Sequence, residues 1–347
     1  MHNYLKRSKH TLTRRTTSSN DLTKAAMGIS PTELENPSSL SLDLFEKSQK
    51  TMLAREMDKR KIANKSILEL IVSFAIFILG AYGHTYIFPL IIPSMTGNVW
   101  TVRDIPYQKL NSGEILLDMA LNETFVPLDQ VTFTDHLLWF VSLQLPLIMI
   151  FVCPQNLHFR AMKWAEISAL ICALLVGLGT SEMITNTLKL YVGRLRPNFY
   201  QMCGFDLQTL TCTGTASAIN QSRKSFPSGH SSLSFTGMTF VVFMLLGRSG
   251  ALSSNSSPSR HITSSRSRYI NSYVLPFYSS DALRRLVYSL CVSPWCLSLY
   301  VATSRLVDHW HHPSDILAGS LIGLVCAGVG YHMWYALVLY ITYYCIR

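Results

Sequence analysis

Six apolar runs constrain the fold of this chain more than any other feature of its sequence. Each run is close to the roughly 17–25 residues that a helix needs to cross a bilayer. A backbone surrounded by lipid must satisfy its own hydrogen bonds, and a helix does so within one segment. We therefore expect an all-α integral membrane protein, with a six-helix transmembrane domain over residues 66–347. The runs lie at 67–93, 136–153, 166–188, 231–247, 286–303 and 316–341.

The charge of the chain narrows the class of partner. Only 14% of the 347 residues are charged, whereas soluble domains contain about 25% charged residues. The formal net charge of +10 could indicate nucleic acid or anionic lipid as a partner. The apolar runs favour the membrane bilayer and argue against a nucleic-acid-binding fold.

The eight cysteines show no metal-ligand spacing. Six of them lie in or beside the apolar runs, where we expect buried thiols. Cys203 and Cys212 lie in a polar loop instead. They could form a disulfide if that loop meets an oxidising compartment.

Two polar stretches fall outside the predicted helices. Residues 1–65 are rich in Ser, Thr, Lys and Arg and poor in aromatic residues, which predicts a disordered basic cytosolic tail. Its 13 Lys and Arg residues could hold it against an anionic leaflet, although a solvated topology signal is the simpler interpretation. Residues 248–285 are Ser-rich and basic, which predicts a flexible cytosolic loop.

The distribution of Lys and Arg sets the expected orientation. With both termini in the cytosol, 22 of the 30 Lys and Arg residues lie on the cytosolic side, as the positive-inside rule requires. The outer pieces are then 94–135, 198–222 and the short turn 304–315. The two longer outer pieces each contain a glycosylation sequon, headed by Asn122 and Asn220.

Three unusual polar segments lie at the outer ends of these predicted helices. Lys189–Pro197 follows the third apolar run, Ser225–His230 precedes the fourth, and Ser304–Asp315 joins the fifth to the sixth. Two crossings separate the second segment from the third, so all three return to one face. Charged residues near the membrane are costly and usually functional, so the topology predicts one site at the outer surface.

The first two segments supply groups that suit a phosphate. Lys189, Arg196 and Arg305 are cationic, and an arginine fork matches phosphate oxygens. Ser228 and Gly229 immediately precede a predicted helix, whose first backbone N–H groups can hold an anion. Together these residues indicate an anion-binding site.

Two histidines, His230 and His311, flank this predicted anion-binding site. They could serve as a nucleophile and a general acid. One of His230 and His311 can attack phosphorus while the other protonates the departing alcohol. If Pro313 lies in the first turn of a helix, His311 and Asp315 share one face, one turn apart. A carboxylate there can fix one imidazole tautomer, which favours His311 as the nucleophile. No carboxylate cluster for magnesium accompanies the histidines, so we expect no metal cofactor.

These spacings resemble a known family. Lys-x6-Arg-Pro, Pro-Ser-Gly-His and Ser-Arg-x5-His-x3-Asp are similar to the three signature motifs of the type 2 phosphatidic acid phosphatase superfamily. Gly193–Phe199 and Asp308–His312 resemble the lipid phosphate phosphatases within it. The resemblance implies a bundle of six transmembrane helices with an active site facing the outside or an organelle lumen. It also implies metal-independent hydrolysis of phosphatidate, lysophosphatidate, sphingosine 1-phosphate and related lipid phosphates.

The resemblance also assigns roles to individual residues. By this resemblance His311 is the nucleophile that forms a phosphohistidine, and Asp315 orients it. His230 is the general acid and then the base for the hydrolytic water. The residues implied to bind the phosphoryl oxygens are Lys189, Arg196, Ser228, Gly229 and Arg305. Glu182 lies seven residues before Lys189, on nearly the same helix face, and could partner a cation.

Two other functions remain compatible with the sequence. A non-catalytic six-span signalling or scaffold relative would lack catalytic residues, whereas every motif residue is present here. A lipid phosphotransferase on the same scaffold would use the same residues, and the sequence does not exclude it. The plasma membrane is the expected location, ahead of an internal membrane. The preferred lipid and a homo-oligomeric assembly are left open.

Overall fold

The computed structural model describes residues 57, 60, 63–83, 86, 99–152, 160–249 and 281–345. The chain divides into two units, Met1–Lys61 and Ile62–Arg347, and everything below concerns the second. Most of the predicted tail and most of the predicted 248–285 loop therefore lie outside the described residues.

Six helices in the described ranges are long and apolar enough to cross a membrane. This confirms the predicted architecture, and the chain is a multi-pass membrane protein. The first of these helices begins before residue 66, because Ala63 to Lys65 are already helical. The six segments are Ala63–Tyr82, Asp135–Val152, Glu166–Val192, Gly229–Gly247, Ala282–Val307 and Pro313–Trp334.

Two of the six crossings are built from more than one element, and a proline explains each case. Pro146 cannot donate to the Ser142 carbonyl, and a π-helical turn precedes it. Pro294 is the first residue of α12, so the chain breaks at Ser293 and starts a new helix there. The elements are α4 (Asp135–Trp139), η4 (Phe140–Gln144), α5 (Leu145–Val152), α6 (Arg160–Val192), α9 (Gly229–Ser249), α11 (Asp281–Val292), α12 (Pro294–Val307) and α13 (Pro313–Cys345).

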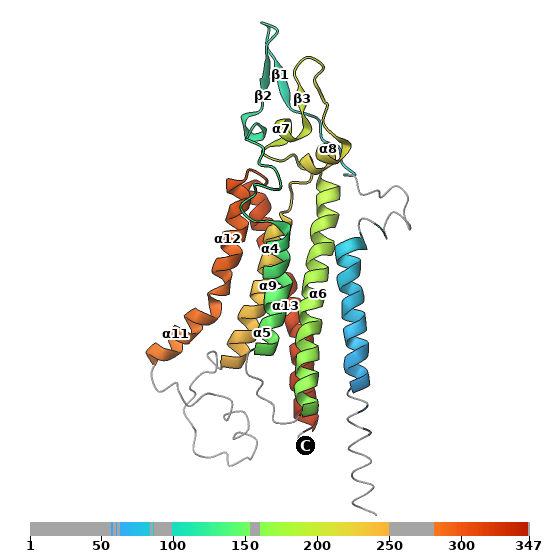
Figure 1. Cartoon of the computed structure of the whole chain (residues 1–347), viewed down its shortest axis with the longest axis vertical. Coiled ribbons are helices and arrows are strands. Elements are labelled where there is room, and N and C mark those ends of the chain that lie inside the picture. Colours follow the sequence, from blue (N-terminus) through green and yellow to red (C-terminus); the bar gives the residue numbers. More distant parts are fainter. Residues whose placement is uncertain are drawn as a thin grey trace, which may run out of the picture. The chain divides into compact units, whose positions relative to one another are not determined.

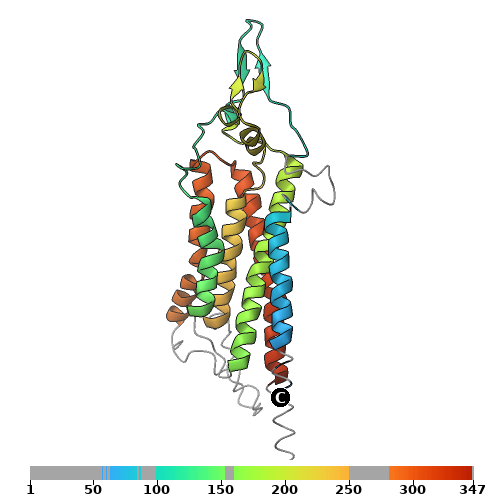
Figure 2. The same cartoon turned by 45° about the vertical axis from the view of Figure 1, so that its right-hand side comes forward.

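Helices α6, α9 and α13 pack together at the centre of the bundle, and α12 packs on α9 (Figures 1 and 2). Glycines permit the close approach of α13 to α9. A Cβ at Gly319 would lie 2.4 Å from the Ser228 carbonyl oxygen, and one at Gly323 would lie 2.4 Å from that of Ser232. Small residues allow such backbone contacts between membrane helices. The start of α9 is thereby held against the start of α13.

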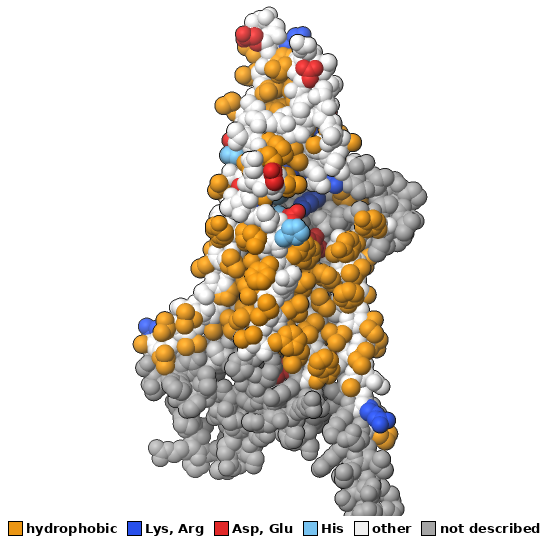
Figure 3. Space-filling model, viewed as in Figure 1, with side chains coloured by type: hydrophobic (Ala, Val, Ile, Leu, Met, Phe, Trp, Pro, Cys, Tyr) orange, Lys and Arg blue, Asp and Glu red, His pale blue; other side chains and the backbone are white. Residues whose placement is uncertain are grey.

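Hydrophobic side chains cover the face of the helices seen in Figure 3. Large apolar residues remain exposed along this bundle, which is unusual for a protein surrounded by water and normal for one surrounded by lipid. Examples are Leu68, Ile71, Leu299, Tyr300, Leu317 and Leu321.

Residues 99–134 and 198–222 fold together into a cap at the end of the bundle where α6 ends (Figure 1). The cap has its own small core, in which Leu121 from the first piece meets Phe199 and Tyr200 from the second. A disulfide joins Cys203 to Cys212, with their Cα atoms 5.3 Å apart. Its elements are β1 (Tyr107–Lys109), β2 (Ile115–Leu117), η3 (Met119–Leu121), α7 (Phe199–Cys203), β3 (Phe205–Asp206), β4 (Thr211–Cys212) and α8 (Ala216–Ser222).

The cap contains short antiparallel strands, β1 with β2 and β3 with β4, which the all-α prediction did not include. Each strand has only two or three residues, too few to give an alternating hydrophobic pattern. The β1–β2 turn depends on Gly113, whose φ of 88° favours glycine.

We predict that Gly323→Ala destabilises the protein and that Gly328→Ala, on the same helix, does not. A Cβ at position 323 would collide with α9 backbone, whereas one at position 328 would meet nothing closer than Phe243 Cε2 at 3.8 Å. Overpacking costs about 1–3 kcal/mol, and both variants gain the same helix propensity. The thermal unfolding midpoint in detergent should fall for Gly323→Ala alone. Equal midpoints would contradict the close contact between α9 and α13.

Candidate active site

The three polar segments predicted to meet do meet, and backbone hydrogen bonds hold them together. The Ser225 N–H donates to the Arg194 carbonyl at 3.0 Å, joining the second segment to the first. The Ser228 N–H donates to the Asp315 carbonyl at 3.0 Å, joining the second to the third. All three lie where α6 ends and where α9 and α13 begin (Figure 1).

The carboxylate of Asp315 is the meeting point of these segments. It is fully buried, and it accepts hydrogen bonds from Arg194 Nη1 at 2.6 Å and Ser225 Oγ at 2.5 Å. The backbone N–H of His312 donates to it as well, at 3.0 Å. Pro313 is the first residue of α13, which places Asp315 in the first turn. A negative charge is favourable there because the first N–H groups of a helix point toward it.

His311 lies beside this carboxylate but makes its closest contact elsewhere. Its Nδ1 is 2.6 Å from the Ser225 carbonyl oxygen and 3.7 Å from Asp315 Oδ2. Because a carbonyl can only accept, Nδ1 must carry the proton, and the lone pair of the neutral ring is then on Nε2. The expected shared face of His311 and Asp315 is present, but Ser225 provides the immediate contact.

Burial lowers the pKa of His311 to about 3, and the nearby cations Arg196 and Lys189 push it in the same direction. Asp315 opposes this shift without cancelling it. At neutral pH the imidazole is therefore uncharged, with Nε2 unprotonated. A histidine in this state can act as a nucleophile.

Lys189 and Arg196 bring positive charge to the same place. Lys189 lies in the last turn of α6, and a Cβ at Gly229 would be only 2.9 Å from its Nζ. Arg196 is buried; its Nε donates to the Gln221 carbonyl at 2.8 Å, and its guanidinium lies 4.5 Å from the Trp310 ring centre. Burial lowers the Arg196 pKa to about 9, which leaves it cationic at pH 7.

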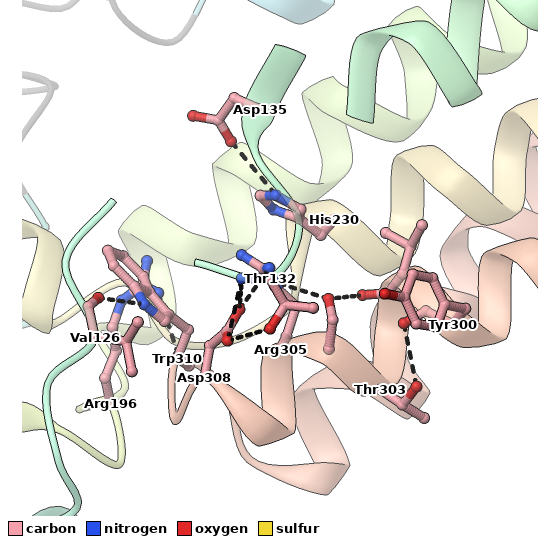
Figure 4. A network of polar contacts seen from close by, with 12 residues as sticks. Val126, Thr132, Asp135, Arg196, His230, Tyr300, Thr303, Arg305, Asp308 and Trp310 are labelled. Carbon is pink, nitrogen blue, oxygen red and sulfur yellow. Dashed lines mark hydrogen bonds and ion pairs between the residues drawn. The ribbon is translucent and has the colours of Figure 1, made fainter. Parts of the chain in front are cut away.

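Arg305 is also buried, and two side chains already hold it. Its Nη2 donates to Asp308 Oδ2 at 2.7 Å and its Nε to Ser304 Oγ at 3.2 Å (Figure 4). Asp308 in turn accepts from the Thr132 backbone N–H at 3.0 Å and from its hydroxyl at 2.7 Å. A guanidinium has five N–H donors, so these contacts orient Arg305 without using all of them.

The start of α9 supplies the remaining predicted groups. Ser228 is fully buried, and its Oγ accepts from the Ser231 N–H at 3.4 Å. Gly229 and His230 are the first two residues of the helix, so their N–H groups belong to its N-terminal turn. Such a turn favours an anion.

Four residues of this site were not among those predicted from the sequence. Arg194 and Ser225 lie within or next to the motifs, so their position in the sequence could have identified them as site residues. Asp308 lies in the Asp308–His312 stretch that resembles the lipid phosphate phosphatases, but no sequence pattern reports its contact with Thr132. Asp135 lies in no quoted motif, and its contact with His230 joins segments far apart in the chain. The Asp135 Oδ1 is 3.5 Å from His230 Nε2.

Of the other predicted residues, Glu182 lies within electrostatic reach of Lys189, whereas Asn122 and Asn220 belong to the cap. Asn122 is exposed in the cap. Asn220 is half-buried, and its Oδ1 accepts from the Val99 N–H at 3.2 Å. Glu182 Oε2 accepts from Asn186 Nδ2 at 2.5 Å. Within the described ranges, no group of three or more His, Cys, Asp and Glu side chains is arranged to hold a metal ion.

Residues 170–339 match the family model described as PAP2 superfamily. This chain carries a PAP2 superfamily domain. The family expected from the motifs is thus confirmed, and the matched region contains all three polar segments.

Curated relatives bear names that agree with this family. The chain is 30% identical over 195 residues to lipid phosphate phosphatase 1 of Arabidopsis thaliana, covering 54% of this chain and 50% of that protein. It is 30% identical over 173 residues to phospholipid phosphatase 1 of Rattus norvegicus, covering 47% and 51%. The matches thus span about half the length of these relatives. No solved structure matches the chain.

We predict that Ser225→Ala lowers stability more than Ser222→Ala. The first variant removes a donor from a buried carboxylate, which costs about 1.5–3 kcal/mol. The second removes a bond from Ser222 Oγ to the Ile219 carbonyl within one short helix, which costs about 0.5–1.5 kcal/mol. Thermal unfolding in detergent compares them directly. A Ser225→Ala midpoint equal to or above that of Ser222→Ala would contradict the role given to this contact.

Proposed function

We propose that this protein is a lipid phosphate phosphatase, which hydrolyses phosphate monoesters of lipids through a phosphohistidine intermediate and without a metal ion. The observation that carries the proposal is the state of His311. Its neutral ring is fixed through Nδ1, and its Nε2 lone pair lies among cations that would hold a phosphate.

The nucleophilic step follows from this geometry. The Nε2 lone pair of His311 attacks phosphorus, and the ring becomes positively charged as the N–P bond forms. The Ser225 carbonyl and the Asp315 carboxylate both stabilise that charge. Asp315 therefore acts by charge and by holding Ser225, whose hydroxyl it binds.

The phosphate oxygens would be held by groups from all three segments. Lys189 and Arg196 neutralise the dianion, and the N–H groups around Ser228 and Gly229 bind its oxygens. Arg305, oriented by Asp308, contributes its remaining N–H donors. Fixed donors of this kind stabilise the transition state because they need no reorganisation during the reaction.

His230 would protonate the departing alcohol and then activate water. It lies close enough to His311, Lys189 and Arg305 to interact with each of them electrostatically. The histidine that has given its proton to the alcohol is the base that next takes one from water. Attack of this water on phosphorus returns the bonding electrons to His311 Nε2 and releases phosphate.

The lipid nature of the substrate is supported by the position of the site and by the names of the relatives. The site lies where the apolar helices α6 and α12 end and α4, α9 and α13 begin, and the ends of membrane-spanning helices are where headgroups are expected. The relatives are named lipid phosphate and phospholipid phosphatases. We therefore infer substrates of the phosphatidate, lysophosphatidate and sphingosine 1-phosphate class.

We propose that the cap and the active site face the outside of the plasma membrane, with both termini in the cytosol. The distribution of Lys and Arg supports this orientation. The Cys203–Cys212 disulfide in the cap supports it independently, because such bonds persist in oxidising compartments.

The catalytic proposal predicts that His311→Ala abolishes phosphate release and that His312→Gln does not. His312 contacts the Leu195 carbonyl through Nε2 and Asp315 through its backbone N–H and carbonyl, so glutamine leaves the bonds to Asp315 intact. The assay is phosphate release from lysophosphatidate by the purified protein in EDTA. Loss of a nucleophile should lower the rate by about a thousandfold or more.

Three results would contradict this proposal. The first is a requirement for added magnesium after chelation. The second is an active His311→Ala protein. The third is a His312→Gln protein as inactive as His311→Ala although both fold normally.

The orientation predicts that Asn122 carries a glycan in a eukaryotic host. Asn122 is exposed on the cap, and its sequon ends at Thr124. Asn122→Gln should remove the glycosidase-sensitive band shift that Asn122 contributes, while Thr124→Ser should keep it because the sequon survives. A cap on the cytosolic side would give Asn122→Gln the same band pattern as the unchanged protein.

A further inference from the structure

His230 has an unusual environment for a general acid. It is the second residue of α9, its side chain is 17% exposed, and its buried Nε2 has no hydrogen-bond partner in the described part of the chain. A free ring nitrogen at a phosphate site is available to the departing oxygen of a substrate. What the motifs do not supply is a group that keeps this ring protonated.

The groups that face His230 from the surrounding elements are mostly positive. They are Arg305 from α12, Lys189 from α6, Arg196 after α6, and the neutral ring of His311 before α13. Neighbouring positive charge opposes protonation of an imidazole. None of these four groups carries a negative charge that would compensate a protonated ring.

Asp135 supplies a negative charge at this position. Thr134 caps α4 by accepting the Leu137 N–H, and Asp135 is therefore the first residue of that helix. Its Oδ1 lies 3.5 Å from His230 Nε2 (Figure 4). At this separation without a hydrogen bond, the carboxylate is near enough to favour the charged ring while Nε2–H stays free.

Asp135 is separate from the signature motifs. It lies on the second crossing, before residues 170–339 that match the family. Its side chain is 71% exposed, so water weakens its effect without removing it. Asp135 also lies within electrostatic reach of Lys189, Arg196 and Arg305, so it faces the site as a whole.

We propose that Asp135 is a positioning residue for His230, holding it as the protonated acid that delivers its proton to the leaving alcohol. This inference rests on the proposed function. As the His311 Nε2 lone pair forms the N–P bond, the P–O ester bond breaks and its electron pair goes to the alcohol oxygen. That oxygen takes the proton from His230 Nε2, and Asp135 compensates the positive charge of the ring until then.

The leaving group provides a direct test. An alkyl alcohol leaves poorly without a proton, whereas a nitrophenolate leaves readily without one. We expect Asp135→Asn to lower kcat/KM for lysophosphatidate by about ten- to a hundredfold. For an aryl phosphate with a nitrophenol leaving group, in the same micelles, the loss should stay below about threefold.

Two further variants separate this role from simple support of α4. Asp135→Glu keeps a carboxylate and should restore most of the lysophosphatidate activity. Asp129→Asn makes the same charge change at an exposed position of the same segment and should leave activity unchanged.

The pH dependence gives a second readout. In Asp135→Asn the alkaline limb of the kcat/KM profile should move to lower pH, because the His230 ring loses its proton more easily without the carboxylate.

If Asp135→Asn loses the same factor in kcat/KM on lysophosphatidate and on the aryl phosphate, or keeps full activity on lysophosphatidate, the role of Asp135 is overturned and the proposed function is not. A loss that is the same at every pH would overturn this role as well. A wild-type protein with no activity on either ester would instead overturn the proposed function, and this inference with it.

Discussion

The buried carboxylate of Asp315 is the interaction on which the rest of the site depends. It binds Arg194 from the first segment, Ser225 from the second and the His312 N–H from its own. Removing one partner from a fully buried ion pair costs about 3–5 kcal/mol, and the cost for this pair is smaller because the Arg194 side chain is 31% exposed. Asp315 and Arg194 are therefore as important for assembling the site as for its chemistry. The nucleophile depends on them indirectly, through the carbonyl of Ser225.

A second set of contacts extends this arrangement into the cap. Asp308 binds both Arg305 and Thr132, and the Trp310 indole N–H donates to the Val126 carbonyl at 3.0 Å. The turn before α13 is thus fixed to the first outer piece as well as to the helices. The segment that contains Val126 and Thr132 leads directly into α4. These contacts therefore also fix the position of Asp135, the first residue of α4. Substitutions in the cap can therefore reach the active site without touching substrate.

The six crossings and the three segments could be predicted from the sequence because each has a strong local signal. A long apolar run predicts a membrane helix, and the number of crossings between the three segments puts them on one face. The i, i+4 spacing of His311 and Asp315 likewise predicted their shared face. The short strands of the cap were missed because two or three residues carry no periodicity. The predicted neighbours His311 and Asp315 do lie together, with Nδ1 3.7 Å from Oδ2, but the closer contact of Nδ1 with the Ser225 carbonyl could not be predicted, since no sequence pattern reports a backbone atom.

The measurement that tests these conclusions most directly is the capture of the phosphorylated protein. Purified protein is mixed with lysophosphatidate carrying radioactive phosphate, quenched in alkali within one turnover and digested for peptide mapping. The structure predicts an alkali-stable, acid-labile label on His311, because its Nε2 has the free lone pair. A label on His230 or His312, or phosphate release without any phosphorylated protein at any time point, would contradict the assignment of His311 as the nucleophile.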